Sequence, residues 1–229
     1  MYYTQLDNKI LSFTFCPKEP GSAVTHLIGI IYSVLLTPVL LIKAALGGAD
    51  ISVLIGCSVF MLSMIMLYTA STVYHSFNLS PAANSVLKKI DHMMIFVLIA
   101  GSYTPICLTV LRGGIGTPLL LAVWILALLG MLFKLCRVNC PKWLSSVIYI
   151  VLGWSCVAAF PALYSGLAPA GFFWLLGGGI LYTVGGVIYA MKFRKLNELS
   201  RNFGSHEIFH VFVMLGNLCQ FFCIFKYCL

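Results

Sequence analysis

Long runs of apolar residues follow one another along the whole chain, separated by short polar connections. The runs cover residues 22–46, 51–77, 90–111, 117–133, 143–163, 171–191 and 206–225. Each can cross a hydrocarbon core of about 30 Å as an α-helix rising about 1.5 Å per residue, the fourth only just. Helices are expected because backbone amides in lipid must pair within their own segment, and the sequence lacks the alternating short strands of a barrel. The pattern predicts an all-α integral membrane protein, a bundle of seven transmembrane helices.

The composition excludes a soluble globular domain. Hydrophobic residues make up 61% of the 229 residues and charged residues 9%, whereas soluble domains carry roughly a quarter charged residues. Residues 1–21 have no apolar core of the signal-peptide type, so we expect a short cytoplasmic segment there. Residues 22–229 are expected to form a single transmembrane domain, with no room for a separate soluble one.

The distribution of Lys and Arg predicts the orientation of the bundle. Eleven of these residues lie in the N-terminal segment and the second, fourth and sixth connections, and three lie on the other side. The eleven are Lys9, Lys18, Lys88, Lys89, Lys134, Arg137, Lys142, Lys192, Arg194, Lys195 and Arg201. Because positive loops stay inside, we expect a plasma-membrane protein with its N-terminus in the cytoplasm and its C-terminus outside. The net charge of +8 is then explained by orientation and anionic lipid heads, without nucleic acid.

This topology brings several polar residues to one membrane face. Ser71 and His75 lie near the inward end of the second run, Asp91 lies in the first turn of the third, and His206 and His210 open the seventh. Ionisable groups within spans are costly and usually functional. The sequence therefore predicts that these side chains meet at the cytoplasmic end of the bundle.

The three histidines have the composition of a zinc site. A His-x-x-x-His pair places two imidazoles on one helix face, and His75 can supply a third nitrogen, which leaves a position open for water. Zn²⁺ suits imidazole ligands. For any one histidine alone, a hydrogen bond to a carbonyl or lipid head group is the better interpretation, and Asp91 has an alternative as a helix N-cap.

The same residues carry a family resemblance. The pattern of Ser71 and His75, then Asp91, then Ser205-His-Glu-Ile-Phe-His210, resembles the hemolysin III family, the bacterial branch of the progestin and adipoQ receptor proteins. Glu19 ahead of Ser22-Ala-Val-Thr-His26 is similar to another of its signatures. The resemblance implies a bacterial seven-helix protein with zinc on His75, His206 and His210, and with Ser71 and Asp91 beside the metal-bound water. The family is also similar to alkaline ceramidases, which implies hydrolysis of a lipid amide.

The residue types suit such a reaction. Zinc lowers the pKa of a bound water toward about 7 and polarises a carbonyl. Asp91 can act as a general base and then as an acid toward a leaving amine, and Ser71 can hydrogen-bond the water or the developing oxyanion. The substrate is expected to be a membrane lipid or another fatty-acyl compound.

Two neighbouring residues leave alternatives open. His206-Glu-Ile-Phe-His210 matches the His-Glu-x-x-His motif of soluble metalloproteases, in which the Glu is the base. We favour instead a Glu207 that faces the head groups or pairs with Arg201, because this helix is apolar. His26 is expected either to act behind the metal ligands or to serve as a cap or interface residue.

Three functions follow from these features. The first is a zinc-dependent hydrolase acting on a lipid amide or ester. The second is a receptor or membrane-state sensor in which zinc is structural. The third is a pore-forming cytolysin, the least favoured because the sequence shows no amphipathic pore-lining pattern.

Cys136 and Cys140 lie in a predicted cytoplasmic loop, where two thiols alone are a weak indication of zinc, and they receive no function. The oligomeric state is not predicted.

Overall fold

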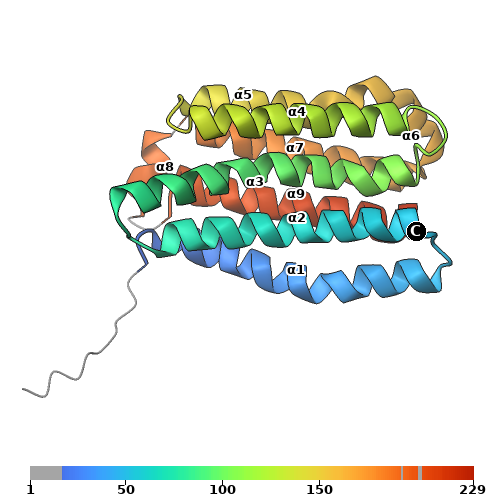
Figure 1. The fold of residues 1–229 in the computed structure, drawn as a ribbon, viewed down its shortest axis with the longest axis horizontal. Helices are drawn as coiled ribbons and strands as arrows, with labels where there is room; N and C mark the ends of the chain where they lie inside the picture. Colours follow the sequence, from blue (N-terminus) through green and yellow to red (C-terminus); the bar gives the residue numbers. More distant parts are fainter. Residues whose placement is uncertain (1–16, 192, 201–202) are drawn as a thin grey trace, which may run out of the picture.

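The computed structural model describes residues 17–191, 193–200 and 203–229, and within these ranges the regular structure is helical. Most of the predicted N-terminal segment 1–21 lies outside the described residues. The helices are α1 (Pro20–Leu46), α2 (Ile51–Ser76), α3 (Pro81–Leu108), α4 (Gly116–Cys136), α5 (Lys142–Gly153), α6 (Phe160–Gly166), α7 (Pro169–Met191), α8 (Arg194–Leu199) and α9 (Ser205–Cys223). The long ones run side by side along one common direction (Figure 1).

Among the described residues, seven helical segments are long and apolar enough to span a membrane, as predicted. Five of them are α1, α2, α3, α4 and α7. The fifth along the chain combines α5 and α6 through a 3₁₀ turn at Trp154–Ala159, and the seventh continues α9 through a π-helical turn at Ile224–Cys228. The chain is therefore a multi-pass membrane protein.

The packing forms a closed ring of neighbours. Helix α2 packs between α1 and α3, and α4 packs on α3 and contacts α5. Helix α5 packs on α7, and α7 packs on α9, which returns to α1. Close approaches occur at glycines: a Cβ on Gly101 of α3 would lie 2.4 Å from Ser63 Oγ of α2, and one on Gly178 of α7 would lie 2.7 Å from Gln220 Nε2 of α9. Small residues thus let these helix backbones approach closely.

The predicted start of the third span is wrong in a way that affects the site. Helix α3 begins at Pro81, not at 90, because Ser80 caps it by accepting a hydrogen bond from Ala83 N at 3.3 Å and proline suits the first helical position. Asp91 consequently lies well inside α3, not in its first turn. The alternative of Asp91 as an N-cap is therefore wrong as well.

Lys134 also differs from its predicted place in a connection. It belongs to the last turn of α4 and is completely buried, with 0% of its surface exposed. The fourth apolar run, which ends at 133 in the sequence, extends in the structure to Cys136. Folding therefore places one basic residue inside the bundle.

Candidate metal centre

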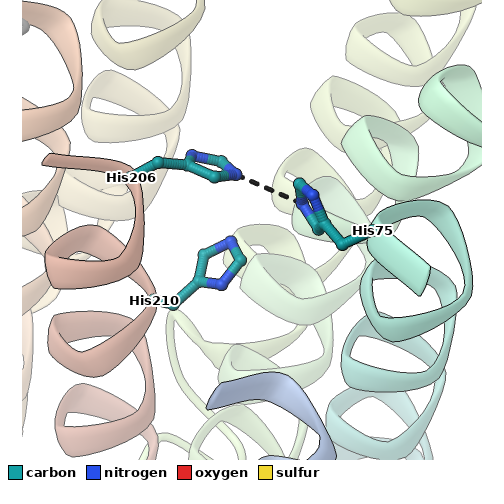
Figure 2. Close-up of side chains that lie close together, drawn as sticks. All are labelled: His75, His206 and His210. Atoms are coloured by element: carbon teal, nitrogen blue, oxygen red, sulfur yellow. Dashed lines mark hydrogen bonds between the residues drawn. The ribbon is translucent and has the colours of Figure 1, made fainter. Parts of the chain in front are cut away.

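Three imidazoles meet between α2 and α9. His75 comes from the last turn of α2, and His206 and His210 come from the first two turns of α9. One nitrogen from each ring lies within 4.8 Å of the others. The Nε2 atoms of His75 and His206 are 3.2 Å apart, and Figure 2 shows the three rings converging from the two helices. The structure thus brings together the three histidines that the sequence singled out.

The donor set and its spacing fit a metal ion. Zinc at about 2.0–2.1 Å from tetrahedrally arranged nitrogens sets those nitrogens about 3.3 to 3.4 Å apart, close to the separation of His75 and His206. All three side chains are shielded, since His75 and His210 are buried and His206 is half-buried. Ser71 Oγ and His206 Nδ1 are buried without a hydrogen-bond partner among the described residues. These imidazole nitrogens form a group that could hold a metal ion.

The start of α1 orients two of the rings from behind. Glu19 Oε2 hydrogen-bonds His75 Nδ1, and Thr25 Oγ1 lies 3.1 Å from His210 Nδ1. Because the Thr25 hydroxyl donates its proton to Ser22 O at 2.9 Å, its oxygen is left to accept from the ring. Both contacts keep Nδ1 as the donor and leave Nε2 free to bind a metal. The hydrogen bond with His75 also lowers the pKa of the Glu19 carboxyl, against the effect of its partial burial.

Glu207 contacts α1 and the start of its own helix. Its Oε1 accepts a hydrogen bond from the Ser22 hydroxyl, and its Oε2 accepts one from Gly204 N at 2.8 Å. The first contact ties α9 to α1 and the second caps α9. Both oxygens are therefore occupied by a structural role, unlike the free base of a His-Glu-x-x-His protease. The expected alternative partner, Arg201, lies outside the described residues.

A fourth histidine lies against the group. The ring of His26, in α1, stacks on that of His210 with centroids 3.6 Å apart and planes 13° from parallel. It is buried, and neither ring nitrogen has a hydrogen-bond partner among the described residues. The expectation that His26 donates a hydrogen bond toward the site is therefore wrong, as is a capping role, and its ring packs on that of His210.

An apolar cavity of about 160 Å³ lies inside the bundle beside His206 and His210. Ser71, Asp91, His206 and His210 line its polar end, and His26 lines it as well. Asp91 is buried, with His92 Nδ1 3.3 Å from its Oδ2. The apolar remainder includes Ile106, Leu119, Leu163, Phe172 and Leu175. The two predicted catalytic residues therefore line the same cavity as His206 and His210, two of the three imidazoles.

Sequence reasoning missed the residues that support the site. Thr25, Ser22 and the contact of Glu19 with His75 were not assigned a role, although Glu19 lies directly before the first apolar run. The predicted topology puts the start of the first span and the end of the second span at the same membrane face. This placement alone would have paired the Glu19 carboxylate with the His75 imidazole. That topological signal was available, whereas the Thr25 contact depends on side-chain packing.

Comparisons with known proteins show the family of the chain. The family described as "Haemolysin-III related" matches residues 14–221. The chain is 39% identical over 211 residues to "Hemolysin-3 homolog" of Bacillus subtilis (strain 168), covering 92% of this chain and 94% of that protein. It is 37% identical over 215 residues to "Hemolysin-3" of Bacillus cereus, with 94% of each covered. The chain belongs to the haemolysin-III-related family of multi-pass membrane proteins.

Proposed function

We propose that the protein is a zinc-dependent hydrolase that cleaves an amide or ester bond in a membrane lipid. The observation that carries this proposal is the convergence of three imidazoles, of which His206 and His210 line an apolar cavity together with a buried carboxylate and a hydroxyl. A purely structural metal site needs neither the cavity nor the additional polar groups. The combination is typical of a catalytic centre.

Zinc is the metal that these residues suit best. Three neutral imidazole nitrogens with no thiolate match the ligands of catalytic zinc sites, which keep one position open. A bound zinc ion would act as a Lewis acid and would lower the pKa of a water molecule enough for it to react at neutral pH. The protein residues supply the remaining steps.

Asp91 and Ser71 provide the proton transfer and the hydrogen bonding. Asp91 accepts a proton from the attacking water as a general base and passes it to the leaving nitrogen or oxygen as a general acid. The Ser71 hydroxyl, which has no partner among the described residues, donates to the carbonyl oxygen as negative charge develops on it. The apolar walls of the cavity hold an acyl chain and exclude bulk water.

The proposed orientation places this chemistry at the cytoplasmic leaflet. The end of the bundle that carries His75 and His206 also carries most of the basic residues, which favours the cytoplasmic side. Single cysteines introduced at Asn78 and Gly48, on a cysteine-free background, test this orientation. We expect a membrane-impermeant thiol reagent added to intact cells to label the second position and spare the first.

Metal content and lipid turnover test the proposed function together. Purified protein should contain about one zinc per chain, and a His206→Ala, His210→Ala variant should contain far less. Wild-type protein should release fatty acid from an acyl-amide or acyl-ester lipid. Asp91→Asn should lose at least about a hundredfold in kcat while retaining zinc, as expected for loss of a general base. Glu207→Gln is the matched control and should keep its activity.

Two other outcomes would change the assignment. Zinc that stabilises the fold without turnover on any tested lipid would favour a receptor or sensor with a structural metal. The name of the Bacillus cereus relative supports a cytolysin as the second candidate. Lysis of erythrocytes by purified protein, unaffected by loss of the three imidazoles, would support that function over a hydrolase.

A further inference from the structure

A second cluster of reactive groups lies between α4 and α5, separate from the imidazoles. Lys134 Nζ lies 2.5 Å from Ser145 Oγ and 3.1 Å from Cys140 Sγ, and the sulfur and the hydroxyl are 3.2 Å apart. The three side chains thus form a closed triangle of an amine, a thiol and a hydroxyl. Tyr149 separates this cluster from the cavity, because its ring lies 5.8 Å from Lys134 Nζ and also lines the cavity.

The buried amine lies beside a partner that can carry negative charge. Lys134 is completely buried, and its hydrogen-bond partners among the described residues are the Cys140 sulfur and the Ser145 hydroxyl. A buried charge is costly unless it is paired. Of these two partners, the Cys140 sulfur is the one that ionises readily. The cluster is therefore built to hold an ammonium beside a thiolate.

Cys140 is also partly exposed to solvent. Cys140 is half-buried and lies in the connection that follows α4, outside the membrane-spanning helices. Burial raises the pKa of its thiol, but the hydrogen bonds with Ser145 and Lys134 outweigh this effect and lower the pKa below its ordinary value. Reactive cysteines share these two properties, a stabilised thiolate and access to solvent.

We propose that Cys140 is a peroxide-reactive modification site whose thiolate is held by Lys134. The sulfur attacks one oxygen of hydrogen peroxide, so that a sulfur–oxygen bond forms as the oxygen–oxygen bond breaks and hydroxide departs. The sulfur is oxidised to a sulfenic acid and the peroxide is reduced. The departing hydroxide takes a proton from the Lys134 ammonium and leaves as water. This inference is independent of the proposed hydrolase activity.

The nearby Cys136 provides an internal control. It ends α4, is exposed, and has no contact with Lys134 among the described interactions. Trypsin cleavage after Lys134, Arg137 and Lys142 places Cys136 and Cys140 in different peptides. Hydrogen peroxide and a carbon nucleophile that traps sulfenic acid can therefore be applied to intact purified protein, with the label on each cysteine measured by mass spectrometry.

We expect Cys140 to be labelled roughly threefold faster than Cys136, or more, at pH 6.5, with a ratio that increases as the pH falls. Lys134→Met should reduce the labelling of Cys140 to the level of Cys136. Lys88→Met is the matched control, because Lys88 Nζ contacts the neighbouring Asn139 at 2.8 Å, and it should leave the ratio unchanged.

The wild-type protein supplies a test that does not depend on folding of a variant. In denaturing detergent the ratio of labelling should fall to about one, because the ammonium no longer lies beside the sulfur. Equal labelling of the two cysteines in folded wild-type protein would overturn the proposal. A folded Lys134→Met variant with unchanged Cys140 labelling would do so too.

Discussion

The carboxylate of Glu19 is expected to strengthen metal binding without contacting the metal. It accepts the hydrogen bond of His75 Nδ1, which fixes the tautomer that leaves Nε2 free and makes that nitrogen more basic. Removing such a partner typically weakens metal affinity by 10- to 100-fold. The Glu19 side chain is 47% exposed, so water can partly replace it. We therefore expect Glu19→Gln to weaken zinc binding by about tenfold, or about 1.4 kcal/mol.

A competition titration with a chromophoric chelator, on purified protein in detergent, measures this change. Glu198→Gln is the control, because Glu198 is an exposed carboxylate paired with Arg194 on α8 and contacts none of the imidazoles. Its zinc affinity should match that of wild type. Glu19→Gln protein that binds zinc within about twofold of wild type would show that the carboxylate does not orient His75, and the account of α1 as a supporting element would be wrong.

Three further predictions concern pH and packing. The pKa of Glu19 in the folded protein is lowered from 4.5. Its contribution to the free energy of unfolding should therefore be complete above about pH 4.5 and be lost as the pH falls through the lower folded-state pKa. Over that range the melting temperatures of metal-free wild type and Glu19→Gln should converge. Gly178→Ala should cost about 1–3 kcal/mol of unfolding free energy, because its Cβ would lie 3.1 Å from Gly216 O. A Cβ on Gly177 would have no neighbouring atom within 4 Å, so Gly177→Ala should leave the free energy of unfolding nearly unchanged in the same detergent-unfolding assay. Tyr68→Phe should lower the free energy of unfolding by about 1–2 kcal/mol, because the Tyr68 hydroxyl lies 2.5 Å from both the Tyr32 hydroxyl and the Asn217 amide nitrogen. Tyr164 is exposed, and Tyr164→Phe should change the free energy of unfolding little.

Hydropathy was sufficient to predict the seven spans, and topology was sufficient to predict which residues meet. His75 and His206 are far apart in sequence, yet alternating the direction of successive spans places them at one end of the bundle. The start of α3 was missed because the segment before residue 90 is polar, although Ser80-Pro81 is a recognisable helix start. The burial of Lys134 could not be predicted, because it depends on which helix covers the end of α4. Side-chain contacts such as Thr25 with His210 depend on helix rotation, which hydropathy leaves undetermined.

Three carboxylates at the histidine end of the bundle have different surroundings, and this difference separates their roles. Glu19 contacts a ring nitrogen, Asp91 faces the cavity, and Glu207 binds Ser22 and a backbone amide. Each amide variant keeps the shape of the side chain and removes its charge. Glu19→Gln should therefore lower zinc affinity, and Asp91→Asn should lower turnover.

Glu207→Gln should instead lower the melting temperature and leave both zinc affinity and turnover near wild type. An amide can still accept the hydrogen bond of the α9 cap, but its weaker acceptor loses part of the charge-assisted contact with Ser22. Measuring zinc affinity, turnover and melting temperature for all three variants assigns one role to each carboxylate. A Glu207→Gln variant that is stable but inactive would indicate that Glu207 is the general base, as in His-Glu-x-x-His proteases. Asp91 would then need another role.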